Sequence, residues 1–234
     1  MSKPKPLPRS QLSKLVVVDA SLHLVDRRGL SALTIRRLSA EVGAPPMSLY
    51  VYFRSKEELH DLMFERLVER LFQAHGGATW QGEFETACRH ARSVLLEHPH
   101  WLPLLTRPVL PTTSLGFYDH MLGLMLEAGF PREAAIHAFS SALSFAVGFV
   151  LTERMMTPRP GVIVPLRRMA LLRAAIPHFA PGTHRHITSA KAAFEAWSFD
   201  KVFDVGLRSL IGGIESEFVP SRARAKRKHR ASAG

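Results

Sequence analysis

Apolar residues recur at helical spacing along most of the chain, beginning with a short stretch near the N-terminus. There the apolar positions Ile35, Leu38 and Val42 fall on one face of a helix, and the charged positions fall on the other. Thr34 precedes them, and a threonine hydroxyl can accept a hydrogen bond from the first turn of a helix. The pattern predicts a short amphipathic helix over residues 34–42.

The following residues predict a tight turn and a second helix. Gly43 stands where a helix end needs a left-handed backbone, and the two prolines shortly after it stop the first helix and allow another to begin. The second helix is predicted over residues 46–53, with Leu49 and Phe53 turned inward. Ser39 is expected where the two helices cross closely. Such a pair forms a helix-turn-helix and indicates DNA binding, and the alternative is an ordinary helical hairpin.

The same periodicity predicts further helices, and strand patterns are scarce. These helices are expected over residues 55–75, 80–97, 101–106, 112–128, 131–156, 165–178 and 198–218. Glycine and proline clusters separate them, and residues 177–188 are expected to be irregular. The chain is therefore predicted to be all-α.

The last predicted helix carries small residues along one face. Gly206 and Gly213 lie seven residues apart, with Ser209 between them on nearly the same face. A glycine inside a helix costs about 1 kcal/mol relative to alanine, so two of them indicate a packing requirement. The pattern is equally consistent with packing inside one protomer and packing between two.

One stretch, residues 134–152, has no formal charge and is long enough to cross a bilayer. It contains His137 and four hydroxyl residues, and a helix that is apolar all round can also be the central helix of a large bundle or dimer. We expect burial in protein and no membrane partner.

Composition fits a helical protein of the cytoplasm. A chain of 234 residues with 46% hydrophobic residues can bury a sizeable core in one small head and one larger body. The lone Cys88 excludes an intramolecular disulfide, and the N-terminus has no apolar signal-peptide core. A reducing cytoplasm is the expected compartment.

The net charge of +11 suggests a polyanionic partner, but much of that charge is concentrated at the C-terminus. Six basic residues lie within the last thirteen: Arg222, Arg224, Lys226, Arg227, Lys228 and Arg230. Their charge and low hydrophobicity predict a disordered basic tail over residues 219–234. A second basic arm over residues 1–10 is expected to be flexible.

The helix-turn-helix stretch carries a family resemblance. Residues 33–56, which contain the run TIRRLSAEVGAPPMSLYVYFRSK, resemble the DNA-binding segment of the tetracycline repressor (TetR) family of bacterial regulators. Residues 11–28 and 55–59 are similar to the family's first helix and to the start of its fourth. Short runs within residues 80–211 are similar to the tetracycline-repressor branch of C-terminal domains. The resemblance covers roughly residues 11–218.

The resemblance implies an N-terminal three-helix helix-turn-helix DNA-binding head and a C-terminal helical ligand-binding and dimerisation domain. The chain would then comprise a flexible basic arm (1–10), a helix-turn-helix DNA-binding domain with its connecting helix (11–75), an effector-binding and dimerisation domain (76–218) and a disordered basic tail (219–234). The homodimer would form through a four-helix interface made by the 131–156 helix and the last helix of each protomer. Its expected residues on the last helix are Gly206, Ser209, Leu210, Gly213 and Ile214.

The resemblance also implies roles in DNA contact. Phosphate contacts position a protein on DNA, and base-edge contacts specify the sequence. The positions expected to face bases or the groove are Arg36, Pro46, Met47, Ser48, Val51 and Tyr52, and those expected to meet the DNA backbone are Thr34, Tyr50 and Lys56. Arg36 could pair with guanine, and Met47 or Val51 could contact a thymine methyl group. For Tyr52 the alternative is packing against the neighbouring helix.

Family members couple binding of a small molecule in the body to release of DNA. The residues that match such a pocket by location are Trp101, Thr106, Tyr118, Met121, Phe139 and Leu143, and each of them could instead be ordinary core. The positions that match the polar and magnesium-binding contacts of tetracycline repressor are Phe72, Ala87, Ala91, Pro103 and Thr152, so the metal ligand is missing. We expect a small, mostly apolar effector other than tetracycline–magnesium, or none, and no cofactor.

Metal and catalytic sites are not expected. His98 with His100 and His184 with His186 invite a metal reading, but alternating histidines alone are weak evidence for a metal site. The chain has no phosphate-binding glycine loop, no HExxH and no GxSxG, so nothing points to an enzyme.

The sequence thus predicts a cytoplasmic dimeric regulator, most simply a repressor that binds a palindromic double-stranded operator and is released by its effector. The alternatives are a DNA-binding regulator without an effector, an activator, and a helical interaction module that has lost DNA binding.

Overall fold

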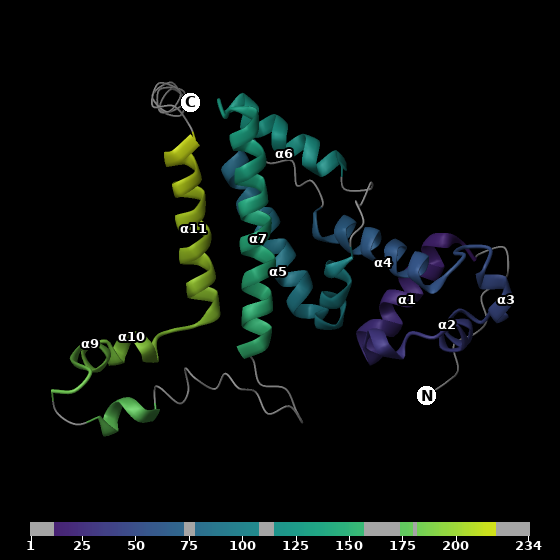
Figure 1. Ribbon diagram of the computed structural model, residues 1–234, viewed down its shortest axis with the longest axis horizontal. Coiled ribbons are helices and arrows are strands. Elements are labelled where there is room, and N and C mark those ends of the chain that lie inside the picture. The colour runs from purple at the N-terminus through teal and green to yellow at the C-terminus, as the bar shows by residue number, and fades with distance from the viewer. Residues whose placement is uncertain (1–11, 73–77, 108–114, 157–173, 180–181, 219–234) are drawn as a thin grey trace. The chain divides into compact units, whose positions relative to one another are not determined.

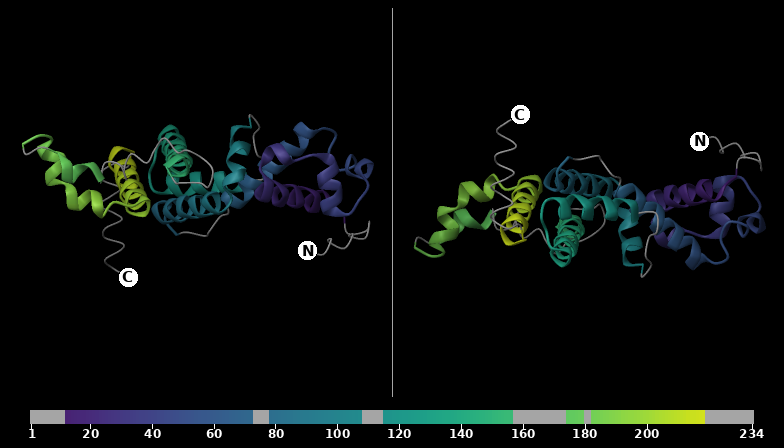
Figure 2. Two further views of the ribbon diagram at one scale, coloured as in Figure 1. Left: turned by 90° about the horizontal axis from the view of Figure 1, so that it is seen from below. Right: turned by 90° about the horizontal axis from the view of Figure 1, so that it is seen from above.

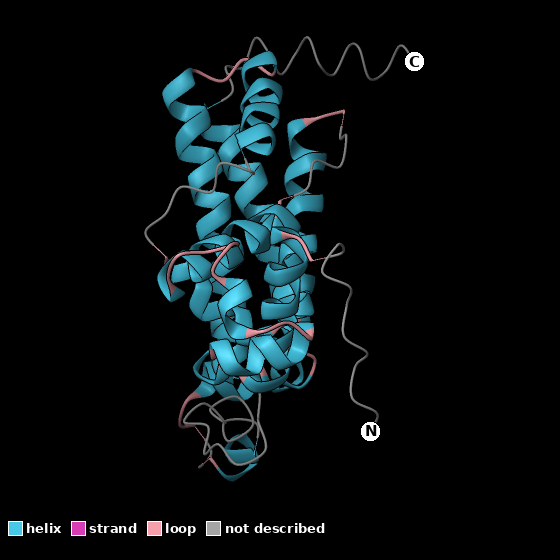
Figure 3. Ribbon diagram, turned by 90° about the vertical axis from the view of Figure 1, so that its right-hand side faces the viewer, coloured by secondary structure: helices cyan, strands magenta, loops and turns pink. Residues whose placement is uncertain are grey.

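The structure is a computed structural model that describes residues 12–72, 78–107, 115–156, 174–179 and 182–218. Within these ranges the regular structure is entirely helical, which confirms the all-α prediction (Figure 3). The chain forms two compact units, Met1–Glu127 and Ala128–Gly234. Each unit is described on its own.

The first unit begins with the predicted helix-turn-helix head (Figure 1). Its elements are α1 (Lys14–Arg28), the 3₁₀ turn η2 (Leu30–Ala32), α2 (Ile35–Val42), α3 (Pro46–Leu49) and α4 (Lys56–Leu71). Hydroxyl groups start three of these helices: Ser13, Thr34 and Ser55 each accept a hydrogen bond from the main-chain N–H three residues later, at 3.2, 3.3 and 3.0 Å. Each cap satisfies a donor that the first turn of a helix would otherwise leave unpaired.

The head has its own hydrophobic core. Apolar side chains from α1, α2, the end of α3 and α4 meet there with almost no exposed surface, including Val17, Leu22, Val25, Leu38, Leu49, Phe53, Leu59 and Met63. The positions predicted to turn inward in the helix-turn-helix, Leu38, Val42, Leu49 and Phe53, are all buried. Burying one such side chain contributes about 1.5–3 kcal/mol, so this core holds the outer surface of the motif in one conformation.

In the described part of the first unit, three further elements follow: α5 (Trp80–Glu97), the 3₁₀ helix η3 (Pro99–Thr106) and α6 (Leu115–Glu127). α5 packs on α4 and α6, and η3 packs on α1 and α4. Compact packing therefore continues past residue 75, the predicted end of the DNA-binding domain; that functional division stays a prediction. Cys88 is buried on α5, and burial raises the pKa of its thiol to about 12.

η3 is a 3₁₀ helix that begins two residues earlier than the predicted 101–106 helix. Pro103 lies inside it and has no N–H to donate. The tighter 3₁₀ geometry is typical of short segments of this kind.

The second unit is built around α7 (Arg132–Met156) and α11 (Phe199–Phe218), which lie side by side (Figure 2). Aromatic rings fill the space between them, with the ring centroids of Phe145 and Phe203 5.5 Å apart and those of Phe149 and Phe203 5.1 Å apart. A Cβ atom on Gly206 would lie 2.9 Å from Cε2 of Phe145. Gly206 therefore meets a packing requirement within the protomer, one of the two explanations left open by the sequence.

α7 is the helix that contains the uncharged stretch. Among the helices that the structure describes, it alone has the length and composition to cross a bilayer, and 33% of its most apolar window is buried. Successive turns of α7 bury Ala135, Ala138, Ala142 and Ala146, whereas Ile136 and Met155 are exposed. One face of α7 is therefore buried within the protomer, and burial of the other face stays a prediction.

The segment before α11 departs from prediction. Residues 177–188 were expected to be irregular, but short helices form at α9 (Arg185–Ser189) and α10 (Lys191–Glu195), so that expectation is wrong from residue 185 onward. Gly182 and His184 take left-handed backbone angles and end the turn there, and alanine, lysine and glutamate favour helix beyond it. Of the helix predicted over 165–178, residues 165–173 lie outside the described residues, and the end forms the 3₁₀ turn η5 (Ile176–His178).

Candidate nucleic-acid interface

The turn between α2 and α3 is fixed by Ser39 and Gly43. Gly43 has φ 69° and ψ 25°, the left-handed conformation that glycine adopts without strain. The Ser39 hydroxyl donates to the Ala44 carbonyl oxygen at 2.5 Å, and the Ala44 N–H donates to the Ser39 carbonyl oxygen at 3.1 Å. This double link joins the end of α2 to the residue that leads into α3.

α3 is shorter than the predicted 46–53 helix and ends at Leu49. Two 3₁₀-type hydrogen bonds frame it: the Ser48 N–H donates to the Pro45 carbonyl and the Tyr52 N–H to the Leu49 carbonyl, both at 2.9 Å. Proline is well suited to the first turn of a helix, so Pro46 begins α3, and the hydrogen bond from Tyr52 to Leu49 closes the segment in a tighter turn. Residues 50–52 form a turn rather than a continuation of the helix.

Most of the predicted DNA-contacting side chains lie on the outer surface of this motif. Met47 is 77% exposed, Val51 81% and Tyr50 44%. Arg36, Pro46 and Lys56 are also exposed, and Ser48 is half-buried. One rigid motif therefore presents these residues together, with two basic side chains, Arg36 and Lys56, available for phosphate or guanine.

Two of the predicted residues have hydrogen-bond partners inside the head. The Thr34 hydroxyl caps α2 through the Arg37 N–H. The Tyr52 hydroxyl donates to the main-chain carbonyl of Leu12 at 2.8 Å, and its side chain is half-buried. The Tyr52 hydroxyl therefore has a partner within the head, and contact of Tyr52 with bases stays a prediction.

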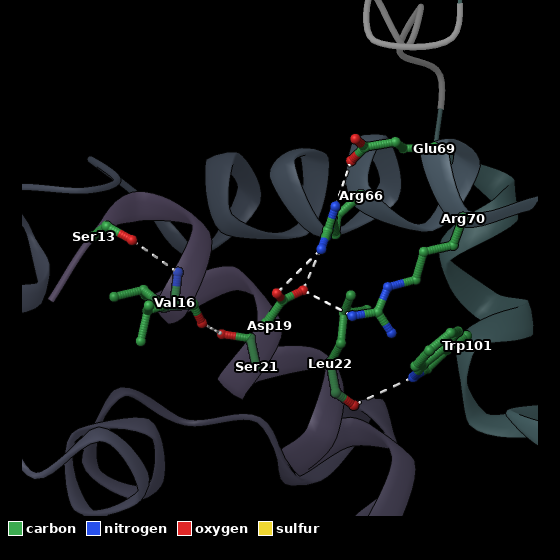
Figure 4. Close-up of polar contacts among 10 residues, drawn as sticks. Ser13, Val16, Asp19, Ser21, Leu22, Arg66, Glu69, Arg70 and Trp101 are labelled. Carbon is green, nitrogen blue, oxygen red and sulfur yellow. Dashed lines mark hydrogen bonds and ion pairs between the residues drawn. The ribbon is translucent and has the colours of Figure 1, made fainter. Parts of the chain in front are cut away.

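An ion-pair cluster fixes α4 against α1 (Figure 4). The Asp19 carboxylate on α1 accepts from Nε of Arg66 and from Nη2 of Arg70, both at 3.0 Å. Glu69 accepts from Nη1 of Arg66 at 2.7 Å. These hydrogen bonds, the one to Asp19 first, raise the pKa of Arg66 above its ordinary value. The groups are mostly shielded from water, which makes the pairing stronger than on an open surface.

Trp101 of η3 joins the same cluster. Its indole N–H donates to the Leu22 carbonyl oxygen on α1 at 3.2 Å, and the Arg70 guanidinium lies 5.4 Å from its ring centroid (Figure 4). The His98 ring stacks on it with centroids 3.8 Å apart. Trp101 was predicted as an effector-pocket residue; the structure gives it contacts with the head, and a contact with effector stays a prediction.

Two of the four histidines that invited a metal reading, His98 and His100, contact the end of α1 instead. Nδ1 of His98 lies 2.9 Å from the Asp26 carboxylate, and Nδ1 of His100 lies 2.7 Å from the Asp26 carbonyl oxygen. A carbonyl oxygen only accepts, so His100 carries its proton on Nδ1 and donates it. Among the residues that the structure describes, no group of three His, Cys, Asp or Glu side chains is placed to hold a metal ion.

Arg107 makes a further link from the end of η3 to α4. Its Nε donates to the Asp61 carboxylate at 2.8 Å, and its Nη2 contacts the same carboxylate. Together with Trp101 and the two histidines, Arg107 connects η3 to both long helices of the head. Sequence reasoning missed these links, because each partner lies more than thirty residues away in the chain.

The other predicted effector residues are divided between the two units. Thr106 is exposed and donates to the Pro103 carbonyl at 2.9 Å, Tyr118 is half-buried and Met121 is buried, all in the first unit. Phe139 and Leu143 are half-buried in the second unit. Their assignment to a pocket stays a prediction.

The predicted dimer residues on α11 fall into two groups. Gly206 lies against Phe145, and Ile214 is buried within its protomer. Ser209 and Gly213 are exposed, Leu210 is half-buried, and a Cβ atom on Gly213 would meet nothing within 4 Å. The second group is the part of the stripe that is open to a partner.

Both parts of the chain match family models. Residues 17–62 match the bacterial regulatory proteins of the tetR family, and residues 73–218 match the tetracyclin repressor-like C-terminal domain. The first match covers most of the helix-turn-helix head, and the second covers the helices from α5 to α11.

Individual relatives agree. The HTH-type transcriptional repressor DrrR1 of Streptomyces coeruleorubidus is 28% identical over 225 residues, 91% of this chain and 81% of its own length. The class A tetracycline repressor from transposon 1721 of Escherichia coli is 27% identical, with 88% of this chain and 91% of its own length covered.

Solved structures show the same fold. A possible TetR family transcriptional regulator from Streptomyces coelicolor A3(2) superposes with a TM-score of 0.68 at 29% identity, covering 87% of this chain and 99% of that one. ActR from Streptomyces coelicolor, solved in complex with actinorhodin, gives a TM-score of 0.73 at 20% identity, covering 89% and 98%. With the family models spanning head and body, the chain belongs to the tetR family of bacterial regulatory proteins.

Proposed function

We propose that this protein is a dimeric transcriptional repressor that binds a roughly palindromic operator in the cytoplasm and releases it when a small, mostly apolar effector binds. The observation that carries the proposal is the outer surface of the head from α2 to the start of α4. There Arg36 of α2, Met47 of α3, Val51 of the following turn and Lys56 of α4 are exposed around a motif whose turn and core are fixed. The repressors among its relatives support the same direction of regulation.

The exposed faces of α7 and α11 support dimerisation. Large apolar side chains on these helices remain open to solvent in one protomer: Ile136 at 54%, Leu151 at 43%, Met155 at 64%, Val202 at 37% and Val205 at 56% exposed. Large apolar side chains that stay exposed on two neighbouring helices fit a contact with another protein. A two-fold dimer would carry two heads and read two half-sites related by symmetry.

The contacts of η3 support coupling between the body and the head. Trp101, His98 and Arg107 join η3 to α1 and α4, and α4 begins with Lys56, a predicted phosphate contact. An effector that binds only one arrangement of η3 would bias the position of α4. Such coupling requires different affinities for the DNA-competent and DNA-incompetent states.

Apolar surroundings argue against tetracycline–magnesium as the effector. Phe72 stands at one of the positions that match its polar contacts, and its ring stacks on Phe117 with centroids 5.5 Å apart. An aromatic pair supplies no ligand for a hard cation such as Mg²⁺, which requires oxygen donors. We therefore expect tetracycline with MgCl₂ to leave operator binding unchanged.

DNase footprinting tests the proposal. The purified protein is titrated on the DNA upstream of its own gene at two salt concentrations, beside a variant with Ser48→Ala and Tyr50→Ala and a variant that lacks residues 219–234. A palindromic footprint that the double substitution removes, that weakens with salt and that survives loss of the tail is expected. Diffuse binding that depends on the tail, or none, would favour a helical interaction module.

Sedimentation equilibrium tests the dimer separately. Met155→Asp places a charge on the exposed face of α7 and is expected to shift micromolar protein towards monomer. Leu115→Asp is the matched control, since Leu115 is 47% exposed and lies on α6. A wild-type monomer at these concentrations would refute the two-headed arrangement.

A further inference from the structure

We propose that the recognition surface of this chain reads the C5-methyl groups of thymine, through Met47 and Val51, rather than the hydrogen-bonding edges of bases. The inference rests on the proposed DNA-binding function and deepens it. Val51 is 81% and Met47 77% exposed, the two highest values among the large hydrophobic side chains that the structure describes. Leaving such groups in water is unfavourable, so the surface that displays them fits an apolar partner.

The rest of this surface offers few groups for hydrogen-bond readout. Residues 44–53 contain no charged side chain. The Tyr52 hydroxyl donates its proton to Leu12, and the Thr34 hydroxyl accepts from the Arg37 N–H. Ser48 and Tyr50 supply the remaining hydroxyl groups of α3 and its turn. A surface of this composition is poorly suited to pair with guanine O6 or adenine N6 and N7.

The only apolar group on a base edge in the major groove is the thymine methyl group. Met47 lies within α3 and Val51 lies in the turn that follows it. The two side chains can therefore meet methyl groups at different positions of one half-site.

The motif holds the backbone of both residues in one position. Leu49 lies between them and is fully buried, Phe53 follows with 1% exposure, and Ser39 fixes the entry to α3 through Ala44. A prepositioned apolar contact binds without a further cost of ordering the backbone. Removing one buried methyl group is expected to weaken binding about fourfold.

The test replaces thymine by 2′-deoxyuridine in the duplex that the footprint defines, one half-site position at a time. Deoxyuridine keeps every Watson–Crick and groove hydrogen bond and lacks only the methyl group. Affinities are measured by fluorescence anisotropy for the full-length dimer and for Met47→Ala, Val51→Ala and Leu15→Ala. Leu15 is the matched control, a 52% exposed side chain of the same head on α1. Circular dichroism checks that each variant folds, as expected for truncation of an exposed side chain.

The expected result is a loss of about fourfold at one or two thymine positions for the wild type and for Leu15→Ala. Met47→Ala and Val51→Ala should bind the thymine duplex more weakly and lose sensitivity to deoxyuridine at one position each, which a double-mutant cycle records as coupling. Unchanged wild-type affinity for deoxyuridine duplexes overturns the proposal, as does an equal loss in all four proteins, which would report DNA shape. A loss on 7-deazaguanine duplexes alone would assign readout to Arg36. Absence of any footprint on unsubstituted DNA instead refutes the proposed function itself.

Discussion

The Tyr52 hydroxyl donates a hydrogen bond to the main-chain carbonyl of Leu12 at 2.8 Å. The bond joins the turn after α3 to the residues that lead into α1, across forty positions of sequence. It therefore ties the predicted DNA-contacting surface to the segment that follows the basic arm.

Tyr52→Phe removes this hydrogen bond and keeps the ring. The free energy of unfolding is expected to fall by about 0.5–1.5 kcal/mol, because the Leu12 carbonyl loses its donor in a partly buried place. Urea denaturation gives the change in stability, and anisotropy gives operator affinity. A large loss of affinity at unchanged stability would show instead that the hydroxyl contacts DNA.

Asp19→Asn tests the ion-pair cluster between α1 and α4. The carboxylate accepts from Arg66 and Arg70, and the amide that replaces it carries no charge and offers one acceptor oxygen instead of two. Stability is expected to fall by about 1–3 kcal/mol, because two partly buried guanidinium groups lose their counter-charge. Glu85→Gln is the control, since Glu85 pairs with Arg89 on the exposed face of α5 and such pairs contribute little.

His60 on α4 predicts a dependence of stability on pH. Its Nε2 is buried without a hydrogen-bond partner in the part of the chain that the structure describes. Burial lowers its pKa below the ordinary value of 6.5, Lys56 and Arg107 lower it further, and Glu57 and Asp61 oppose them.

The sign follows from proton binding. The unfolded chain holds a proton on His60 more readily than the folded chain, so the stabilising contribution is complete well above pH 6.5 and is lost as the pH falls towards the folded pKa. Urea denaturation between pH 5 and pH 8 should show stability falling with acid for the wild type and a flatter profile for His60→Gln. Parallel profiles for the two proteins would exclude His60 as the source.

Substitutions at Gly206 and Gly213, both on α11, are expected to change the stability in opposite directions. Gly206→Val places atoms against the Phe145 ring, where even a Cβ atom would lie 2.9 Å from Cε2, and should cost about 1–3 kcal/mol of stability. Gly213→Ala meets nothing in its own protomer and should gain up to about 1 kcal/mol from helix preference. Urea denaturation compares the two, and sedimentation equilibrium shows whether Gly213→Ala weakens the dimer.

Local sequence patterns predicted the head well because they act over a few residues. Gly43 was expected in a left-handed conformation and has φ 69°, and Leu49 and Phe53 were expected inside and are buried. The Thr34 cap was predicted from residue type and is present. The length of α3 was not predicted correctly, because hydrophobic spacing cannot distinguish a 3₁₀ turn over residues 50–52 from another turn of α-helix.

Long-range contacts were beyond the reach of the sequence. His98 and His100 suggested a metal site through their spacing, but their partners are the side chain and main chain of Asp26, more than seventy positions earlier. Trp101 suggested a pocket through its residue type, and its N–H binds a main-chain carbonyl that no side-chain pattern reveals. Helices α9 and α10 were missed because the proline and glycine residues before them dominated the local signal.

The links from η3 to α1 rely on the backbone of the head more than on its side chains. Trp101 and His100 both donate to main-chain carbonyl oxygens, those of Leu22 and Asp26, which any residue type provides. These hydrogen bonds between η3 and α1 can therefore persist while the amino acids of the head change to suit a new operator. During evolution, a protein built in this way can keep its proposed response to an effector while its head comes to bind a different DNA sequence.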